Sequence, residues 1–298
     1  MPGAFFQTRD SWLNFGFPSA SGQHWTSSPF TLTLRAMQFL ITLAVAALLS
    51  GSTVSASAQG ANCLGPPYET PSSPDQELIA QIYAEIMPVL GTVLFSPQPS
   101  GDGTPTICLV KIADDAHGVF DATTKNVLLE RGLSDGLLAG ILLHELRHAD
   151  QFNRGFCPSN DVSMEENARG VAAMEADASA TSLMAAWELR QKGRPAAWNA
   201  LALWDTQKDI AEAFSREMSR SGDTSLAVSA AFSQWYASEY RTESYYIASC
   251  SDYLDRQDTE HLLPSYDLLP GDFLDNLCTL PDGSVYPCED SDWTALSR

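Results

Sequence analysis

Basic residues are scarce in this chain. Over 298 residues it carries 17 Lys and Arg against 37 Asp and Glu, which gives a formal net charge of −20. A surface with this balance repels phosphate backbones and anionic lipid headgroups, so the composition argues against nucleic acid and anionic membranes as partners. The sequence also lacks a P-loop, a dinucleotide-binding fingerprint, an internal repeat and any CxxC or Cys/His cluster that would indicate a second metal site. The chemistry must therefore be sought in other motifs.

Apolar runs long enough to cross a membrane are also missing. The run Phe39–Leu49 has eleven residues, which is short for a bilayer span. Arg35 precedes it and Ala56-Ser57-Ala58 follows as an A-x-A-type cleavage site, so we predict a secretory signal within a leader at residues 1–58. Translation is expected to start at the internal Met37. An uncleaved signal anchor is the alternative.

The stretch His144-Glu145-Leu146-Arg147-His148 fits HExxH, the arrangement with which zinc peptidases hold their metal. Residues four apart lie on one face of a helix, so both imidazoles can reach a single ion. Glu145 lies one step round the helix, where its carboxylate can polarise a water without being a ligand. The motif predicts Zn²⁺ bound by His144 and His148, with Glu145 as the general base.

The flanking sequence supports a zinc site on a helix. An apolar stretch precedes the motif, and Ser134 and Asp135 are plausible residues to cap the helix. Upstream, residues 117–130 indicate a hairpin. Zinc peptidases of the zincin fold place an edge strand before the HExxH helix, and a substrate can add to such an edge. We expect Val127–Glu130 to be that edge strand.

A catalytic zinc requires a third protein ligand. The metzincin pattern HExxHxxGxxH is excluded, because Gln151 and Arg154 occupy its glycine and third-histidine positions. The next predicted helix carries Glu175 among alanines, whose small side chains let two helices approach closely. Glu165 and Glu166 also lie on this helix, but its first turn explains them as capping residues. Glu175 is therefore the expected third ligand; the aspartates, Asp161 and Asp177 first, are the fallback.

A family resemblance is visible at these residues. HExxH followed one helix later by a glutamate is similar to the gluzincin branch of the zinc peptidases. More narrowly, HELRHADQF, SMEENARGVAAMEADASA and AWELRQKG resemble a bacterial "putative metallopeptidase" domain of unknown function over residues 74–249. The resemblance implies His144, His148 and Glu175 as zinc ligands and Glu145 as base. The chain departs from the pattern at Ser179, where thermolysin-like gluzincins place an Asp that orients a ligand histidine.

Two further roles stay open in the sequence. The residues that orient the ligands are unassigned, since Asp177 is expected on the opposite side of its helix and Asp150 fits helix-surface charge better. Gluzincins also use a Tyr or His to stabilise the oxyanion. Six candidates fit that role without a preference among them: Tyr236, Tyr240, Tyr245, Tyr246, His117 and His261.

Cysteine usage agrees with export. All six cysteines follow the predicted cleavage site, and an even number in an exported chain predicts three disulfides. Only Cys278 and Cys288, which flank a Pro-Asp-Gly turn, can be paired from sequence. Loss of the leader removes Arg9, Arg35 and Asp10, leaving 15 basic and 36 acidic residues and a net charge of −21.

The predicted fold is α+β and zincin-like, with a small mixed sheet and a helix-rich C-terminal part. Residues 59–261 would form the peptidase domain and residues 262–298 an irregular, disulfide-tied tail. Strands are expected at residues 92–95, 107–112, 119–121 and 127–130, and helices at residues 74–90, 134–153, 163–191, 195–219 and 224–249.

The predicted function is a zinc-dependent peptidase, periplasmic or secreted, that acts on peptides or proteins and has no stable membrane association after cleavage. Two alternatives remain. One is a non-catalytic, zinc-stabilised binding or inhibitory protein, against which an intact Glu145 argues, because a purely structural site needs no base. The other is a zinc amidase that acts on a non-peptide amide such as a cell-wall cross-link.

Overall fold

The computed structural model describes residues 60, 62–94, 104–112 and 116–290, so the predicted leader lies outside the described residues. The described elements, in chain order, are β1 (Cys63–Leu64), α1 (Pro74–Ile86), the 3₁₀ helix η1 (Met87–Val89), α2 (Leu90–Val93), β2 (Thr106–Val110), β3 (Gly118–Asp121), β4 (Asn126–Glu130), α3 (Asp135–Asn153), α4 (Met164–Gln191), α5 (Ala196–Leu203), α6 (Lys208–Ser221), α7 (Thr224–Tyr236), α8 (Glu239–Thr259) and α9 (Phe273–Leu277). The architecture is α+β and mostly helical, as predicted.

The sheet is small and mixed. Its strand order is β1-β2-β4-β3, in which β2 and β4 run parallel and the two outer pairs are antiparallel. The prediction that Val127–Glu130 is the edge strand is wrong: this segment, β4, lies between β2 and β3. Val127 and Leu129 are buried, and β4 pairs along its full length with β2. The edge beside the HExxH helix is instead β3, the first strand of the hairpin.

The strand expected at residues 92–95 is also wrong where it is described. Residues 87–93 form η1 and the short helix α2, and Phe95 lies outside the described residues. Val89, Leu90 and Val93 are all buried there. A spacing of three and four residues places these side chains on one helical face, and a short apolar run cannot be assigned to strand or helix from its hydrophobicity alone.

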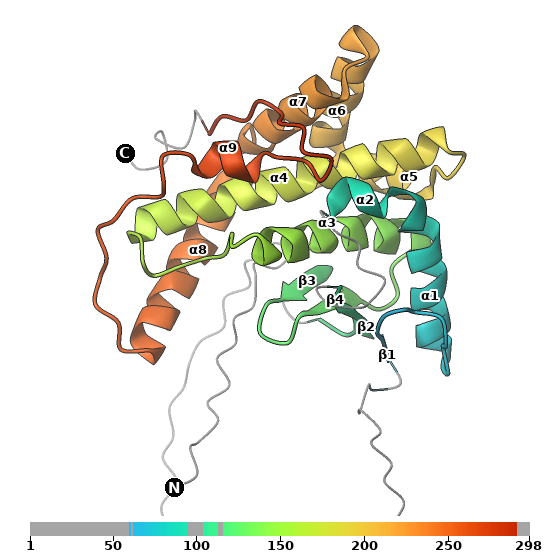
Figure 1. The fold of residues 1–298 in the computed structure, drawn as a ribbon, viewed down its shortest axis with the longest axis horizontal. Coiled ribbons are helices and arrows are strands. Elements are labelled where there is room, and N and C mark those ends of the chain that lie inside the picture. The colour runs from blue at the N-terminus through green and yellow to red at the C-terminus, as the bar shows by residue number, and fades with distance from the viewer. Residues whose placement is uncertain (1–59, 61, 95–103, 113–115, 291–298) are drawn as a thin grey trace, which may run out of the picture.

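Two helices at the centre of the fold form as predicted. Ser134 begins α3 by accepting a hydrogen bond from the backbone N–H of Leu137, and Ser163 begins α4 in the same way through Glu166. Figure 1 shows α3 and α4 lying side by side, with the sheet against α3 and the helices α6 and α7 on the other side of α4. Both helices are therefore buried over most of their length.

The two long C-terminal helices predicted from sequence are each divided. The segment 195–219 forms α5 and α6, and the chain leaves the helix at Trp204, which has an extended backbone. The segment 224–249 forms α7 and α8, because Ser238 caps a new helix that continues to Thr259. Of the predicted tail, residues 262–290 are described, and they contain α9 and a bridge between Thr279 and Val285.

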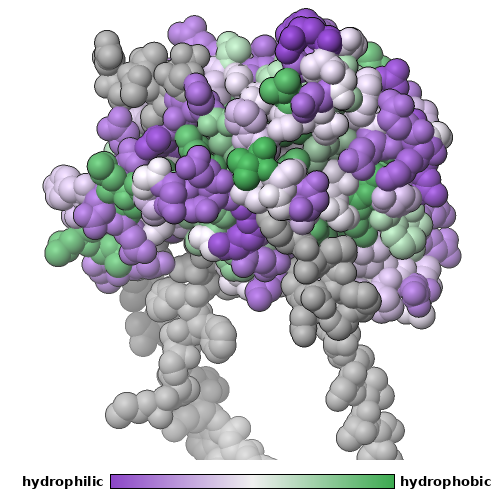
Figure 2. All heavy atoms as spheres, turned by 45° about the horizontal axis from the view of Figure 1, so that its top comes forward, coloured by the Kyte–Doolittle hydropathy of each residue, from purple (hydrophilic) through white to green (hydrophobic). Residues whose placement is uncertain are grey.

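Two of the three expected disulfides are present. Cys278 pairs with Cys288, as predicted, and Cys63 pairs with Cys108 across β1 and β2. The expectation of a third is wrong, since Cys157 is an exposed free thiol and Cys250 a partly buried one. None of the described helices has the length and apolar character needed to cross a membrane. On the face drawn in Figure 2, hydrophilic residues predominate and hydrophobic ones form small separate groups.

Candidate metal centre

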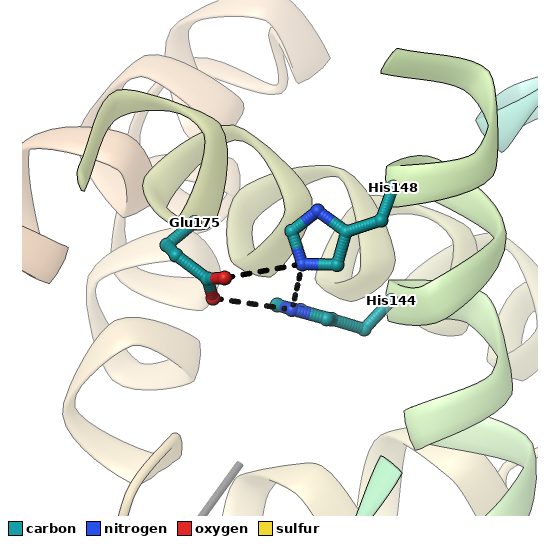
Figure 3. Close-up of side chains that lie close together, drawn as sticks. All are labelled: His144, His148 and Glu175. Atoms are coloured by element: carbon teal, nitrogen blue, oxygen red, sulfur yellow. Dashed lines mark hydrogen bonds and ion pairs between the residues drawn. The ribbon is translucent and has the colours of Figure 1, made fainter. Parts of the chain in front are cut away.

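Two neighbouring helices bring three potential ligands together. His144 and His148 project from α3, and Glu175 projects from α4 toward them (Figure 3). The two Nε2 atoms lie 2.9 Å apart, and the carboxylate oxygens of Glu175 lie 3.5 Å from His144 Nε2 and 3.3 Å from His148 Nε2. The spacing of the motif on α3 and the small residues of α4 together allow this approach.

The three side chains fit a single zinc ion. Ligand bonds of about 2.0–2.1 Å in a tetrahedron place the ligand atoms roughly 3.3 Å apart. The three observed separations, 2.9, 3.3 and 3.5 Å, scatter around that value. Two neutral imidazoles and one carboxylate are also the ligand set of a catalytic zinc site, which leaves a fourth position for water or substrate.

Burial makes this cluster a strong cation site. Each of the three side chains is 2% exposed. Burial alone would raise the pKa of Glu175, but the attraction of His148 outweighs it and lowers the pKa to about 2. Burial likewise opposes protonation of His148, yet Glu175 raises its pKa to about 9, whereas burial and repulsion from His148 lower the pKa of His144 to about 4. The carboxylate of Glu175 thus favours a positive charge at His148, and a metal ion can supply that charge in place of the proton.

Glu145 lies beside this cluster and faces the edge of the sheet. Its carboxylate accepts a hydrogen bond from the backbone N–H of Phe120 in β3. Burial raises its pKa to about 8, against the attraction of His148. A β-carbon built on Gly118 would lie 2.7 Å from Glu145 Oε1, closer than side-chain atoms tolerate. The carboxylate thus packs directly on the backbone of β3, in a space that only glycine leaves open.

Tyr245 is the oxyanion candidate that reaches the cluster. Its hydroxyl donates a hydrogen bond to the carboxylate of Glu175, and the helix α8 that carries it packs against α4. Burial, with the nearby Glu175, raises the pKa of Tyr245 well above 10. The hydroxyl therefore stays protonated and can donate a hydrogen bond. The other candidates have different surroundings: Tyr236 is buried against Trp235 and Phe232, Tyr240 and His261 are exposed, Tyr246 interacts with Cys250, and His117 stacks on Trp204.

A chain of hydrogen bonds extends outward from His148. Its Nδ1 lies 2.8 Å from Gln151 Oε1, and Gln151 Nε2 donates to Asp177 Oδ2 at 2.7 Å and to the backbone carbonyl of Met174 at 2.9 Å. Because the amide nitrogen of Gln151 has two acceptors, its oxygen must face the histidine, which fixes Nδ1 of His148 as the protonated nitrogen. Nε2, which faces His144 and Glu175, is then the nitrogen that would bind a metal.

The burial and the partners of Asp177 and Asp150 differ from what the sequence suggested. Asp177 is fully buried and accepts hydrogen bonds from Arg147 and from the hydroxyl of Tyr286 in the tail. Asp150 is also buried and pairs with Arg147 at 2.9 Å, so it is not a surface charge. Arg147 belongs to the HELRH motif, and its guanidinium joins α3 to Asp177 on α4 and to backbone carbonyls of the tail.

The competing carboxylates lie elsewhere. Glu165 and Asp161 are exposed. Glu166 lies in the first turn of α4, where its Oε2 accepts hydrogen bonds from Arg169 and from the backbone N–H of Leu269. Of the described residues, the group of His, Cys, Asp and Glu side chains able to hold one ion is His144, His148 and Glu175.

A second motif match has a structural explanation. Gly132-Leu133-Ser134-Asp135-Gly136 has the G-x-S-x-G spacing of a serine nucleophile elbow. Here the Ser134 hydroxyl accepts the hydrogen bond that caps α3. Such an elbow lies between a strand and a helix, as this one does, but the hydroxyl of Ser134 serves the helix end and has no histidine among its hydrogen-bond partners in the described residues.

Sequence reasoning missed most of the supporting residues. Gln151 stands three residues after His148, a spacing that brings helix side chains together, so its contact could have been anticipated. Tyr286 and Gly118 gave no such signal, because their contacts join segments far apart in the chain.

Comparison with known proteins agrees with this chemistry. A family model described as "Putative metallopeptidase family" matches residues 56–288, which include all four candidate site residues. No curated protein and no solved structure matches the chain.

Proposed function

The chain belongs to the "putative metallopeptidase" family, and on that premise we propose that it is an exported, zinc-dependent peptidase of the gluzincin type. The observation that carries the proposal is the approach of His144, His148 and Glu175 to within 2.9–3.5 Å of one another in the interior. The family implies a metal, and this donor set fits zinc.

In this proposal His144, His148 and Glu175 hold the zinc ion. When bound, the metal supplies Lewis acidity, which acidifies water and polarises a carbonyl. Gln151 keeps the ring of His148 in the tautomer that leaves Nε2 available. Glu175 is itself oriented by the hydroxyl of Tyr245.

Glu145 acts as the general base. It takes a proton from the attacking water and later returns it to the leaving amine. A raised pKa, about 8, suits this role, because a carboxylate that readily binds a proton near neutral pH can both accept and return one. Its hydrogen bond to Phe120 N–H and its packing against Gly118 hold the carboxylate in one orientation.

The substrate backbone is proposed to lie along the free edge of β3. Phe120 belongs to this edge strand, which pairs with β4 on its other side. An extended peptide can add to such an edge through main-chain hydrogen bonds. Tyr245 is the proposed donor to the oxyanion, since its hydroxyl reaches the cluster. Its one hydrogen would turn from Glu175 to the oxyanion as the oxyanion forms.

Two disulfides support export, because they persist in oxidising compartments. The predicted signal at residues 1–58 adds to this. Mass mapping of the N-terminus of the secreted or periplasmic form is expected to find a start near Gln59. A mature chain that keeps Phe39–Leu49 would contradict the signal.

The activity is tested on the purified protein with a mixed peptide library read by mass spectrometry, together with its metal content. We expect about one zinc per chain and cleavage that a chelator abolishes and added zinc restores. Cleavage of peptides, rather than of cross-linked cell wall alone, separates a peptidase from an amidase. Bound zinc without hydrolysis of either substrate would instead favour the non-catalytic alternative, and cleavage unaffected by chelation would refute the metal mechanism.

A further inference from the structure

A pocket of about 410 Å³ opens next to the candidate metal centre. Four of its lining residues follow directly from the residues of that centre. Phe152 lies one helical turn after His148, and Val171 lies one turn before Glu175. Ser249 lies one turn after Tyr245. Ala122 follows the end of β3, two residues after Phe120. One turn advances a helix by about 5.4 Å. The pocket therefore lies about one helical turn from the candidate metal centre, toward the C-terminal end of α3.

The deeper part of this pocket presents hydrogen-bond donors. Asn167 is 3% exposed, and its Oδ1 accepts from the backbone N–H of Ser159 at 2.9 Å and from Arg256 Nη2 at 3.4 Å. Because two donors face Oδ1, the other amide atom must be Nδ2. Nδ2 has no hydrogen-bond partner among the described residues.

Arg256 adds a positive charge beside Asn167. Neutral amides hold it, since its Nε donates to Asn160 Oδ1 at 2.9 Å and its Nη2 to Asn167. No carboxylate of the described residues lies within ion-pair distance of it, although acidic residues outnumber basic ones about two to one in this chain. A guanidinium offers five N–H donors, and these two hydrogen bonds use two of them.

Three acidic residues also line the pocket: Asp161, Asp252 and Glu260. Asp161 and Glu260 are exposed, so water and salt screen their charge over about 8–10 Å. Asp252 is half-buried and lies one helical turn before Arg256 on α8. A group that reaches Asn167 would contact Arg256 directly. Asn167 and Arg256 thus offer hydrogen-bond donors to a ligand that accepts through oxygen atoms. A carboxylate matches these donors best.

We infer that this pocket is a substrate subsite that binds a carboxylate of the peptide through Arg256 and Asn167. The inference rests on the proposed peptidase function. Asn167 lies eight residues from Glu175 on α4, about 12 Å along the helix. An extended peptide covers about 3.3–3.6 Å per residue, so the carboxylate is borne about three or four residues from the scissile bond. It is either an acidic side chain or the C-terminus of the substrate.

Binding is measured with the Glu145→Gln full chain, which keeps the pocket but is not expected to turn substrate over. The probes are alanine heptapeptides with one Glu or one Gln, each with a free or an amidated C-terminus, and one with Lys. We expect the dissociation constant to rise roughly ten- to a hundredfold when the recognised carboxylate becomes an amide, as for a lost charge-assisted hydrogen bond. The four combinations of side chain and terminus identify which carboxylate is recognised.

Variants then place the recognition in the pocket. Arg256→Gln and the isosteric Asn167→Asp should remove the discrimination between carboxylate and amide, whereas Arg216→Gln, an exposed arginine on α6, should retain it. Cys157 lies on the pocket wall and is exposed, so in a Cys250→Ser background it is the one free thiol. Saturating peptide should slow its alkylation by iodoacetamide.

Several results would overturn the inference: equal binding of all probes, preference for the Lys peptide, no binding, unchanged discrimination in Arg256→Gln, or unprotected Cys157. Failure of the peptidase function gives a different pattern. Selective binding of the carboxylate peptide without cleavage by the wild-type protein would leave the subsite standing and remove the activity. Cleavage by the wild-type protein without selective binding of the carboxylate peptide would leave the activity standing and remove the subsite.

Discussion

Arg147 Nε donates a hydrogen bond to Asp177 Oδ2 at 2.7 Å, and neither side chain has any exposed surface. The arginine comes from within HELRH and the aspartate from two residues after Glu175. One motif therefore serves two sides of α3: its histidines face the metal centre, and its arginine faces a buried ionic network. That network also reaches the backbone carbonyls of Leu277 and Thr279 in the tail.

The same aspartate connects the network to a ligand. Asp177 accepts from Gln151, whose oxygen faces His148, and from Tyr286, which lies within the loop closed by Cys278 and Cys288. The disulfide-tied tail is thus packed against the residues that orient the metal site. Leu277, Leu280 and Tyr286 of the tail belong to the hydrophobic core of the described residues.

Gln151→Met tests the orienting role. Methionine has a similar length but cannot hold the Nδ1 proton of His148, so we expect the zinc dissociation constant to rise about ten- to a hundredfold. Competition with a chromogenic zinc chelator measures it. Gln191→Met, at the exposed end of α4, is the matched control and should bind zinc normally. Unchanged affinity in Gln151→Met would show that the hydrogen bond does not position the ligand.

Acid stability tests the ion pair of Arg147 and Asp177. Burial alone would raise the pKa of Asp177, but Arg147 outweighs it and lowers the pKa below 3.8, its ordinary value. The pair then stabilises the fold fully above about pH 4, and this contribution is lost as the pH falls through the lower pKa of the folded state. Asp177→Asn leaves Arg147 without this partner, which should cost about 3–5 kcal/mol at pH 7.

The measurement is urea unfolding of metal-free protein between pH 7 and pH 3. The gap in unfolding free energy between the wild type and Asp177→Asn should narrow toward pH 3. Asp255→Asn, at an exposed position of α8, should stay close to the wild type throughout. A gap that is constant with pH would mean that the charge of Asp177 is not what stabilises the fold.

Local sequence patterns predicted the two central helices, α3 and α4, but not the order of the strands in the sheet. The capping serines and the apolar stretch before His144 predicted α3 and α4 within a residue at each end, because these signals are local. Strand order, by contrast, depends on which segments meet. The hairpin was visible in the sequence, but the insertion of β4 between β3 and β2 was not.

The candidate site shows the same division. His144, Glu145 and His148 follow from one spacing on one helix. Asp177 was expected on nearly the opposite side of its helix from Glu175, but the sequence could not show that Arg147 and Tyr286 would bind it. A buried carboxylate is recognisable only once its partners are known.

Comparing Glu175→Ala with Glu166→Ala tests the third ligand. Loss of Glu175 removes one of three ligands, so zinc affinity should fall by orders of magnitude. Glu166 instead holds Arg169 and the backbone of Leu269, so its loss should cost about 1–2 kcal/mol of stability and leave zinc bound. Calorimetric zinc titration of both variants decides. The reverse order would refute the gluzincin assignment.

Gly118→Ala tests the packing of the base. The new β-carbon would lie 2.3 Å from Ile141 Cγ2 and 2.7 Å from Glu145 Oε1, so one or both must move. We expect a cost of about 1–3 kcal/mol in stability and a loss of turnover with zinc retained, because the ligands do not contact this position. Gly91→Ala has open space and serves as control. Normal turnover in Gly118→Ala would show that the orientation of Glu145 is not critical.

Glu145→Gln separates the base from the ligands. The amide keeps the size of the side chain, and its oxygen can still accept from Phe120 N–H, so the fold and the zinc content should be unchanged. It cannot accept the proton of the attacking water, so turnover should fall about 10²- to 10⁴-fold. Elemental analysis and peptide cleavage are measured on the same preparation. Loss of zinc would make Glu145 a ligand, and undiminished turnover would place the base elsewhere. Either result would contradict the role of Glu145 alone, because the zinc-binding measurements, and not the turnover measurements, test His144, His148 and Glu175.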